Sequence, residues 1–295
     1  MSLAPPTFSV ALKLGRISNL PTVWTNTLVG VTLVGGSVLD PRMPILLVAM
    51  SLFYTGGMYL NDAFDREFDA RSRPERPIPA GQVSAQAVFT SGFAMLGAAL
   101  ALLVMVGYGV PGGTGLRAPA AGALLAAAIV LYNWHHKANP LSPILMGVCR
   151  MLVYLTAALA FADIVDSKLL LAALVLLSYL IGLTYTAKRE HLNELGSLWP
   201  LAALAVPVIY GGILAVNVPA AWPFLLMLAA WILYALRLLH RRAKGDVPRA
   251  VVSLIAGISL LDALILAGAS AWQLGVTAVI AFGLTLALQR VVAGT

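Results

Sequence analysis

Ten apolar segments joined by short polar connections constrain the fold of this chain more than any other feature of its sequence. Each segment is close to the roughly 20 residues that a helix needs to cross a bilayer. Several contain Gly and Pro, which membrane helices tolerate where neighbouring helices cover them. The segments occupy residues 17–38, 43–64, 84–108, 118–134, 142–162, 168–187, 198–216, 221–239, 250–269 and 272–291.

The composition agrees with this pattern and predicts a single all-α polytopic membrane domain over residues 1–295. Charged residues make up only 11% of the chain, against about 25% in soluble domains. The net charge is +7, but the basic residues are divided among short connections, which argues against a nucleic-acid partner. Cys149 is the only cysteine, so no intrachain disulfide can form. Residues 1–10 lack a basic region and a cleavage site, so we expect no removed signal peptide.

The basic residues also predict the orientation of the chain. Fifteen of the 19 Lys and Arg residues lie near the N-terminus or in the connections that follow the even-numbered segments. The opposite side holds Arg42, Arg117 and Lys168, and Arg150 lies inside a segment. Because positively charged loops stay in the cytoplasm, we expect a multi-pass protein of the inner (cytoplasmic) membrane with these connections on the cytoplasmic side.

An acidic run at the end of the second segment carries the strongest chemical signal. Asn61, Asp65 and Asp69 are spaced four residues apart, so a helix would place them on one face, with Asp62 one step around the same turn. Bare like charges at this spacing repel one another. Mg²⁺ would remove the repulsion, since it shares a few carboxylates with substrate phosphates. Donors to the same phosphate oxygens would come from the arginines that follow, Arg66, Arg71, Arg73 and Arg76.

A solvated helix end is the alternative interpretation of this run. Its place at the end of a membrane helix, and its continuation into an arginine and proline loop, favour a binding site. Residues 56–62 (GGMYLND) and 76–81 (RPIPAG) resemble the NDxxDxxxD motif and the following loop of the UbiA superfamily of intramembrane prenyltransferases. The resemblance implies a UbiA-like bundle of nine core transmembrane helices in two pseudo-repeated four-helix halves, with an extra tenth helix at 272–291. Within the superfamily the chain is most similar to the bacterial EboC-like branch.

The second half of the chain carries a fainter copy of this pattern. Glu190 and Glu194 follow the sixth segment, where the family has a second acidic motif that is usually DxxxD. This correspondence predicts pseudo-repeats over about 14–138 and 139–245, with C-terminal helices over about 250–291. The glutamates are candidate ligands of a second metal, or alternatively an exposed pair held by Lys188 and Arg189.

A third group of candidates lies at the end of the fourth segment. Residues 131–140 (LYNWHHKANP) resemble the family's tyrosine and lysine loop, whose lysine helps to hold diphosphate, so Lys137 and Tyr132 are carried over. His135 and His136 are adjacent and would diverge by about 100° on a helix, so we expect them at the membrane interface and not as chelators.

Two charged residues, Arg150 and Asp262, lie inside apolar segments. Intramembrane ionisable residues usually face a cavity or each other. Both are therefore candidate pocket residues, and a direct Arg150–Asp262 pair is one arrangement open to them.

Together these features predict a Mg²⁺-dependent intramembrane prenyltransferase that moves an isoprenyl group from an isoprenyl diphosphate to an unidentified small acceptor. The apolar bundle would hold the isoprenoid tail and shield the allylic cation from water. The resemblance implies catalytic roles for Asp65, Asp69 and Lys137. It implies metal ligation by Asn61, Asp62, Asp65, Asp69, Glu190 and Glu194, diphosphate binding by Arg66, Arg73, Arg76, Lys137, Lys188 and Arg189, and pocket positions for Tyr132, Tyr185, Arg150 and Asp262.

Two other classes remain open. A non-catalytic UbiA-like transporter or scaffold would explain the intramembrane charges and the repeat, but not the carboxylates that continue into an arginine loop. A CDP-alcohol phosphotransferase also uses membrane aspartates with a metal, but its DGxxAR pattern does not occur in this chain.

Overall fold

The computed structural model of the chain describes residues 6–137, 139–187 and 199–294. Over these residues the chain forms helices and turns and contains no β-strand. The α-helices are α1 (Phe8–Leu14), α2 (Leu20–Leu33), α3 (Arg42–Phe64), α4 (Arg66–Ser72), α5 (Ala85–Val104), α6 (Arg117–His135), α7 (Ser142–Leu159), α8 (Ser167–Ala187), α9 (Ala205–Asn217), α10 (Trp222–Arg241), α11 (Asp246–Gly268) and α12 (Trp272–Gln289). Shorter helical turns are η1 (Ile17–Asn19), η2 (Met105–Gly109), η4 (Trp199–Leu204) and η5 (Pro219–Ala221).

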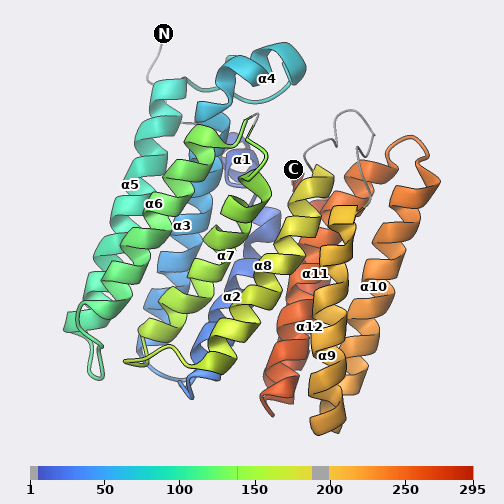
Figure 1. Cartoon of the computed structure of the whole chain (residues 1–295). Helices are drawn as coiled ribbons and strands as arrows, with labels where there is room; N and C mark the ends of the chain where they lie inside the picture. Colours follow the sequence, from blue (N-terminus) through green and yellow to red (C-terminus); the bar gives the residue numbers. More distant parts are fainter. Residues whose placement is uncertain (1–5, 138, 188–198, 295) are drawn as a thin grey trace.

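Each predicted apolar segment overlaps one of the helices α2, α3 and α5–α12, which lie side by side in one bundle (Figure 1). Eight described helices are long and apolar enough to span a membrane. The two that fall short are α2, with 14 residues, and the helix Leu201–Asn217 that contains α9. The predicted all-α polytopic membrane protein is confirmed, and the internal repeat stays a prediction.

The acidic run does not continue along one straight helix. α3 ends at Phe64, the chain turns at Asp65, and α4 begins at Arg66 and lies across the end of the bundle (Figure 1). Backbone hydrogen bonds from Asp65 to Asn61 and from Asp69 to Asp65 keep a helical spacing through this turn. The turn therefore bends the arginine segment over the helix ends without separating the carboxylates.

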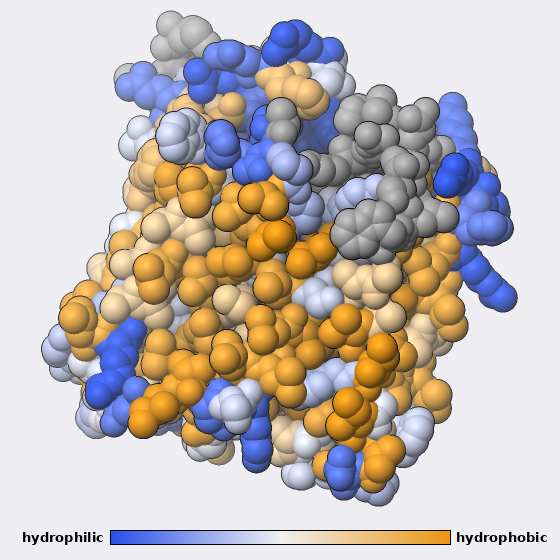
Figure 2. Space-filling model, in the orientation of Figure 1, coloured by the Kyte–Doolittle hydropathy of each residue, from blue (hydrophilic) through white to orange (hydrophobic). Residues whose placement is uncertain are grey.

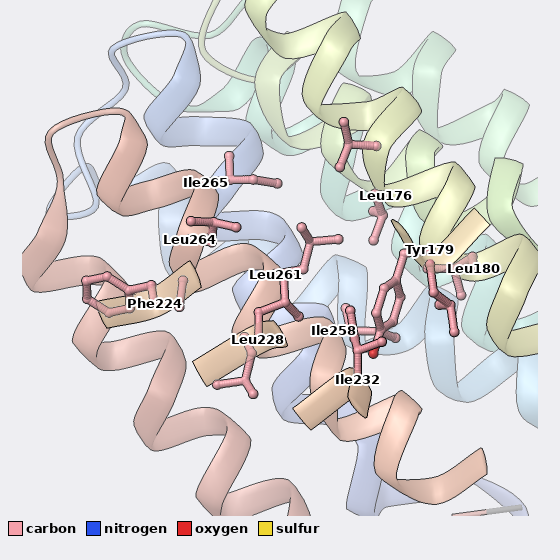
Figure 3. Close-up of a cluster of buried hydrophobic side chains, with 14 of the residues drawn as sticks. Leu176, Tyr179, Leu180, Phe224, Leu228, Ile232, Ile258, Leu261, Leu264 and Ile265 are labelled. Carbon is pink, nitrogen blue, oxygen red and sulfur yellow. The ribbon is translucent and has the colours of Figure 1, made fainter. Parts of the chain in front are cut away.

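The most deeply buried of the described spans is α11, which packs against α8, α10 and α12. Figure 3 shows the centre of this cluster, where Tyr179 of α8 lies beside Ile258 and Leu261 of α11. A second cluster joins α3, α5, α6 and α7. Because lipid tails are as apolar as these side chains, such contacts stabilise the bundle through close packing and not through exclusion of water.

A glycine permits the close crossing of α2 and α7. A Cβ atom at Gly30 would lie 2.4 Å from the carbonyl oxygen of Tyr154, well inside van der Waals contact. The missing side chain lets the two backbones approach, as small residues do in membrane bundles. This crossing brings Asn26 of α2 close to the α7 residues that are described below.

The predicted extra helix, α12, packs against α11 and α2. Gln289 at its end donates a hydrogen bond to the Asn19 side chain, and Asn19 in turn donates to the carbonyl oxygen of Gly294. The C-terminal end of the described chain is thereby attached beside η1, at the same end of the bundle as α4.

The surface of the bundle carries a broad apolar band between two more polar ends. Figure 2 shows the band across the middle of the molecule and hydrophilic residues around α4. The band carries large exposed hydrophobic residues such as Leu124, Leu171 and Leu226, so it is suited to contact with lipid.

Candidate active site

A cavity of about 460 Å³ opens at the α4 end of the bundle, between α2, α3, α6, α7, α8 and α11. Its size falls within the range of ligand-binding pockets. Among its interior lining residues are Val23, Met50, Phe53, Leu125, Ile129 and Val153, whereas Asn61, Asp65, Arg73, Arg76, His136 and Lys137 lie near its mouth. This cavity thus has a charged mouth and an apolar interior.

A second groove, of about 610 Å³, lies between η4, α9 and α10. Its described lining is apolar apart from His240 and Arg242, and it contains no carboxylate. The cavity with the charged mouth is therefore the candidate active site.

Two arginines pair with Asp62 and Asp69, which are buried beside the mouth and do not themselves line the cavity. Arg16 and Arg76 each donate to Oδ1 of Asp62 at 3.1 Å, and Arg76 also reaches Oδ2 of Asp69 at 3.0 Å. Burial, together with the nearby charges of Asp65 and Asp62, raises the pKa of Asp69 despite the opposing effect of Arg76. Further positive charge at this position would relieve the repulsion.

Asp65 lies against the loop that follows α6. Its Oδ2 is 3.0 Å from Nζ of Lys137 and 3.3 Å from Nε2 of His136. Burial raises the pKa of Asp65, but the hydrogen bond from His136 and the charges of His136 and Lys137 outweigh it, so the pKa lies below its ordinary value. Lys137 also sits 3.8 Å from the centre of the Phe68 ring, which keeps its ammonium group over the mouth.

Asn61 is oriented by a second buried asparagine. Its amide nitrogen donates to Oδ1 of Asn133 at 3.1 Å, and Asn133 donates to the carbonyl oxygen of Gly57 at 3.0 Å. This arrangement turns Oδ1 of Asn61 outward, where it accepts from Arg16 at 3.1 Å. Asn133 therefore determines which atom of Asn61 faces the mouth.

The donor chemistry of these residues fits Mg²⁺. Asn61, Asp62, Asp65 and Asp69 offer hard oxygen ligands, which Mg²⁺ prefers. In the described residues no three His, Cys, Asp or Glu side chains form a ready metal-binding group. The carboxylates face Arg16, Arg76 and Lys137 instead, so basic groups neutralise them in this state.

The sequence matches the model of the UbiA prenyltransferase family over residues 23–253. The chain belongs to this family. A digeranylgeranylglyceryl phosphate synthase from Methanopyrus kandleri is 29% identical over 272 residues, which cover 90% of either protein. The predicted superfamily and enzyme class, a membrane prenyltransferase, are confirmed, and the placement in the EboC-like branch stays a prediction.

Solved structures of other UbiA homologs share the fold of this UbiA protein. One from Aeropyrum pernix has a TM-score of 0.62 at 16% identity and covers 85% of this chain and 96% of its own. Another, from Archaeoglobus fulgidus and bound to GPP and Mg²⁺, has a TM-score of 0.59 at 14% identity, covering 87% and 99%. At these identities the likeness concerns the architecture alone.

Among the predicted residues that the structure describes, those that line the cavity are Asn61, Asp65, Arg73, Arg76, Tyr132, Lys137 and Arg150. The ring of Tyr132 stacks on His136 at 4.9 Å between ring centres. Arg66 does not reach the cavity: its guanidinium pairs with Glu67 on the outer face of α4 and lies over Phe89. Tyr185, on α8, is half-buried and is not a lining residue. Lys188, Arg189, Glu190 and Glu194 lie outside the described residues.

The direct Arg150–Asp262 pair is not formed. Asn26 lies between the two residues, accepting from Arg150 at 2.9 Å and donating to Asp262 at 2.8 Å. Arg150 lines the cavity, whereas Asp262 is fully buried behind it. The direct pair cannot form because α2 packs between α7 and α11. This packing places the Asn26 amide between the guanidinium of Arg150 and the carboxylate of Asp262.

Three functional candidates were missed by sequence reasoning. In the sequence Arg16 contributed only to the charge bias that predicts orientation. Nothing in the sequence indicated its left-handed backbone conformation (φ 43°) or its contact with Asp62. Asn133 lies inside the quoted tyrosine and lysine loop, four residues before Lys137 in the sequence. His136 was expected at the interface, but it is turned inward to Asp65.

Proposed function

We propose that this UbiA protein, with Mg²⁺, transfers an isoprenyl group from an isoprenyl diphosphate to the free hydroxyl of a prenylated glyceryl phosphate. The observation that carries the proposal is a cavity with an apolar interior, whose mouth is lined by Asp65, Lys137 and Arg76, with Asp69 paired to Arg76 directly beside it. The acceptor class rests on the name of the Methanopyrus relative, which describes a glyceryl phosphate with two geranylgeranyl groups. A precursor with one such group and one free hydroxyl is the matching acceptor.

The residues at the mouth would divide the binding of the diphosphate between them. Asn61, Asp62, Asp65 and Asp69 would hold Mg²⁺, which when bound neutralises the charge that develops on the leaving diphosphate. Arg16, Arg76 and Lys137 would then donate to the phosphate oxygens through charge-assisted hydrogen bonds. Arg73, at the rim, would add a further donor. The same proposal includes Glu190 and Glu194 as ligands of a second metal ion.

The transfer itself exchanges one C–O bond for another. The bond between C1 of the isoprenyl group and the diphosphate breaks, and its electron pair leaves with the diphosphate. The acceptor hydroxyl oxygen forms the new bond to C1, and its proton departs on the released diphosphate. Phe53, Leu125 and Ile129 in the cavity wall would exclude water, so that the allylic cation reacts with the acceptor and not with solvent.

The proposal also places the cavity mouth on the cytoplasmic side of the inner membrane. Arg71 lies on α4, Arg73 and Arg76 lie in the loop after it, and Lys137 lies in the loop after α6. These connections are among those in which basic residues are concentrated. Short loops with this charge bias remain in the cytoplasm.

Purified protein in lipid nanodiscs tests the proposal. Geranylgeranyl diphosphate, Mg²⁺ and geranylgeranylglyceryl phosphate should yield digeranylgeranylglyceryl phosphate, detected by mass spectrometry. The Asp65→Asn variant and wild type in EDTA should yield none. A lipid extract of cells that overproduce wild type, compared with the same variant, would reveal a different acceptor.

The transporter or scaffold alternative makes the opposite prediction. It expects no diphosphate-dependent product from any fraction, with Asp65→Asn and wild type giving identical lipid profiles. Nothing in the cavity favours it, because the paired carboxylates and basic groups lie where a diphosphate would bind.

A further inference from the structure

A further positive charge, that of Arg150, lies deeper in the cavity than the basic groups that would bind diphosphate. Arg150 lines the cavity from α7, eight residues after the helix begins at Ser142. Its guanidinium carbon lies 5.4 Å from the centre of the Tyr54 ring. Tyr54 precedes Asn61 by seven residues on α3, which corresponds to about 10 Å along the helix axis. Arg150 is therefore separated from the mouth by about two helical turns.

Most of the hydrogen-bonding capacity of Arg150 is unused. Its Nη1 donates to Oδ1 of Asn26 at 2.9 Å. In the part of the chain that the structure describes, its Nε and Nη2 donate no hydrogen bond, and no carboxylate lies within ion-pair distance. A guanidinium has five N–H donors in a planar fork, which is suited to two oxygens of a phosphate or carboxylate.

The groups behind Arg150 hold it in this position. Asn26 and Asp262 are fully buried, and Asn26 donates to Oδ2 of Asp262 at 2.8 Å. The Tyr154 hydroxyl donates to Oδ1 of the same carboxylate. Both oxygens of Asp262 are thus occupied, and the interposed amide keeps that carboxylate away from the guanidinium.

We propose that Arg150 binds an anionic group on the acceptor, such as a phosphate or a carboxylate, and so determines which acceptors the enzyme accepts. This inference rests on the proposed function. With the donor diphosphate at the mouth and the acceptor anion at Arg150, the interval between them holds C1 of the donor and the acceptor hydroxyl. Arg150 takes no part in making or breaking bonds, and the proton and the leaving group follow the course given above.

The experiment compares two acceptors that differ only in the anion. Wild type, Arg150→Met and Arg150→Lys would be assayed with geranylgeranyl diphosphate and either geranylgeranylglyceryl phosphate or the uncharged geranylgeranylglycerol. We expect Arg150→Met to lower kcat/KM for the phosphate acceptor by about 10- to 100-fold, the range for a hydrogen bond to a charged group. Its kcat/KM for the alcohol and its KM for the donor should stay near wild type. Arg150→Lys should recover part of the preference for phosphate.

Two further variants separate recognition from structure. Arg117→Met removes an arginine that pairs with Asp163 near the opposite end of the bundle, and it should leave acceptor preference unchanged. Asp262→Asn removes the buried carboxylate but leaves Arg150 charged. If Arg150 binds the anion, this variant keeps or increases the preference for the phosphate acceptor, whereas a purely structural network predicts the same loss as Arg150→Met.

The possible outcomes distinguish the two proposals. If wild type prenylates neither compound, the proposed function is wrong, and the assignment of Arg150 falls with it. If wild type is active but Arg150→Met lowers both reactions equally or leaves the preference for phosphate intact, only the assignment of Arg150 is wrong. If Asp262→Asn behaves like Arg150→Met, the network is structural and the assignment is overturned.

Discussion

Replacing Asn133 with leucine tests whether this buried amide orients Asn61, the proposed metal ligand. Leucine has the same branched shape as asparagine, a larger volume and no polar atoms, so it removes both hydrogen bonds of Asn133 without opening a cavity. The Asn61 amide nitrogen loses its acceptor at 3.1 Å and stays buried. An unpaired buried donor costs about 1–3 kcal/mol, and we expect the free energy of unfolding to fall by that amount.

The effect on the site should exceed the effect on the fold. Without Asn133 the Asn61 amide can rotate, so its oxygen is no longer held toward Arg16 and the carboxylates. Loss of a group that orients a metal ligand typically costs 10- to 100-fold in metal affinity or activity. We therefore expect the Mg²⁺ concentration for half-maximal prenyl transfer to rise by about 10- to 100-fold.

The assay measures turnover of geranylgeranyl diphosphate in nanodiscs across a Mg²⁺ titration, normalised to folded protein. Asn217→Leu provides the matched control, because Asn217 is exposed on α9 and donates only to the carbonyl oxygen of Ile213 in the described structure. An unchanged Mg²⁺ midpoint in Asn133→Leu, with any loss of rate explained by less folded protein, would refute the reasoning.

Three further predictions follow from the site and the orientation. Asp65→Asn and Asp69→Asn should each abolish Mg²⁺-dependent transfer while the protein remains folded in the membrane, because each loses a carboxylate that would hold the metal; full activity of both variants, measured by product formation, would contradict this. Glu194→Gln should weaken diphosphate binding by more than the roughly 1 kcal/mol of an exposed pair, and Glu190→Asp/Glu194→Asp should also lose turnover because Mg²⁺ tolerates poor geometry badly; wild-type rates in both would make the glutamates a solvated helix end. In a Cys149→Ala background, cysteines at Ser72 and Ala243 should react with an impermeant thiol reagent only from the cytoplasmic side, and one at the exposed Leu116 only from outside; labelling of Ser72 and Leu116 from one side would show that the span count between them is wrong.

Patterns that are local in the sequence were sufficient to predict the helical architecture and the acidic run of the candidate site. The lengths and hydropathy of the ten segments follow from the thickness of the bilayer, and each segment was found to overlap a helix. The run from Asn61 to Asp69 could be identified because a helical spacing of four residues brings its oxygen-bearing side chains together. The turn at Asp65 could not be anticipated, because a bend that keeps backbone hydrogen bonds leaves no clear trace in the spacing.

The hydrogen-bond partners of these side chains were decided by tertiary structure alone. Arg16 reaches Asp62 from 46 positions away, and Asn133 reaches Asn61 from 72 positions away. A spacing rule within one helix carries no information about residues at such separations. In the same way, Arg150 and Asp262 were recognised as charges inside the membrane, but the amide of Asn26 between them depends on how closely α2 packs against α7 at Gly30. The sequence thus determined which residues carry chemistry along each helix, and helix packing decided which of them face one another, because contacts between helices depend on crossing geometry that no single segment contains.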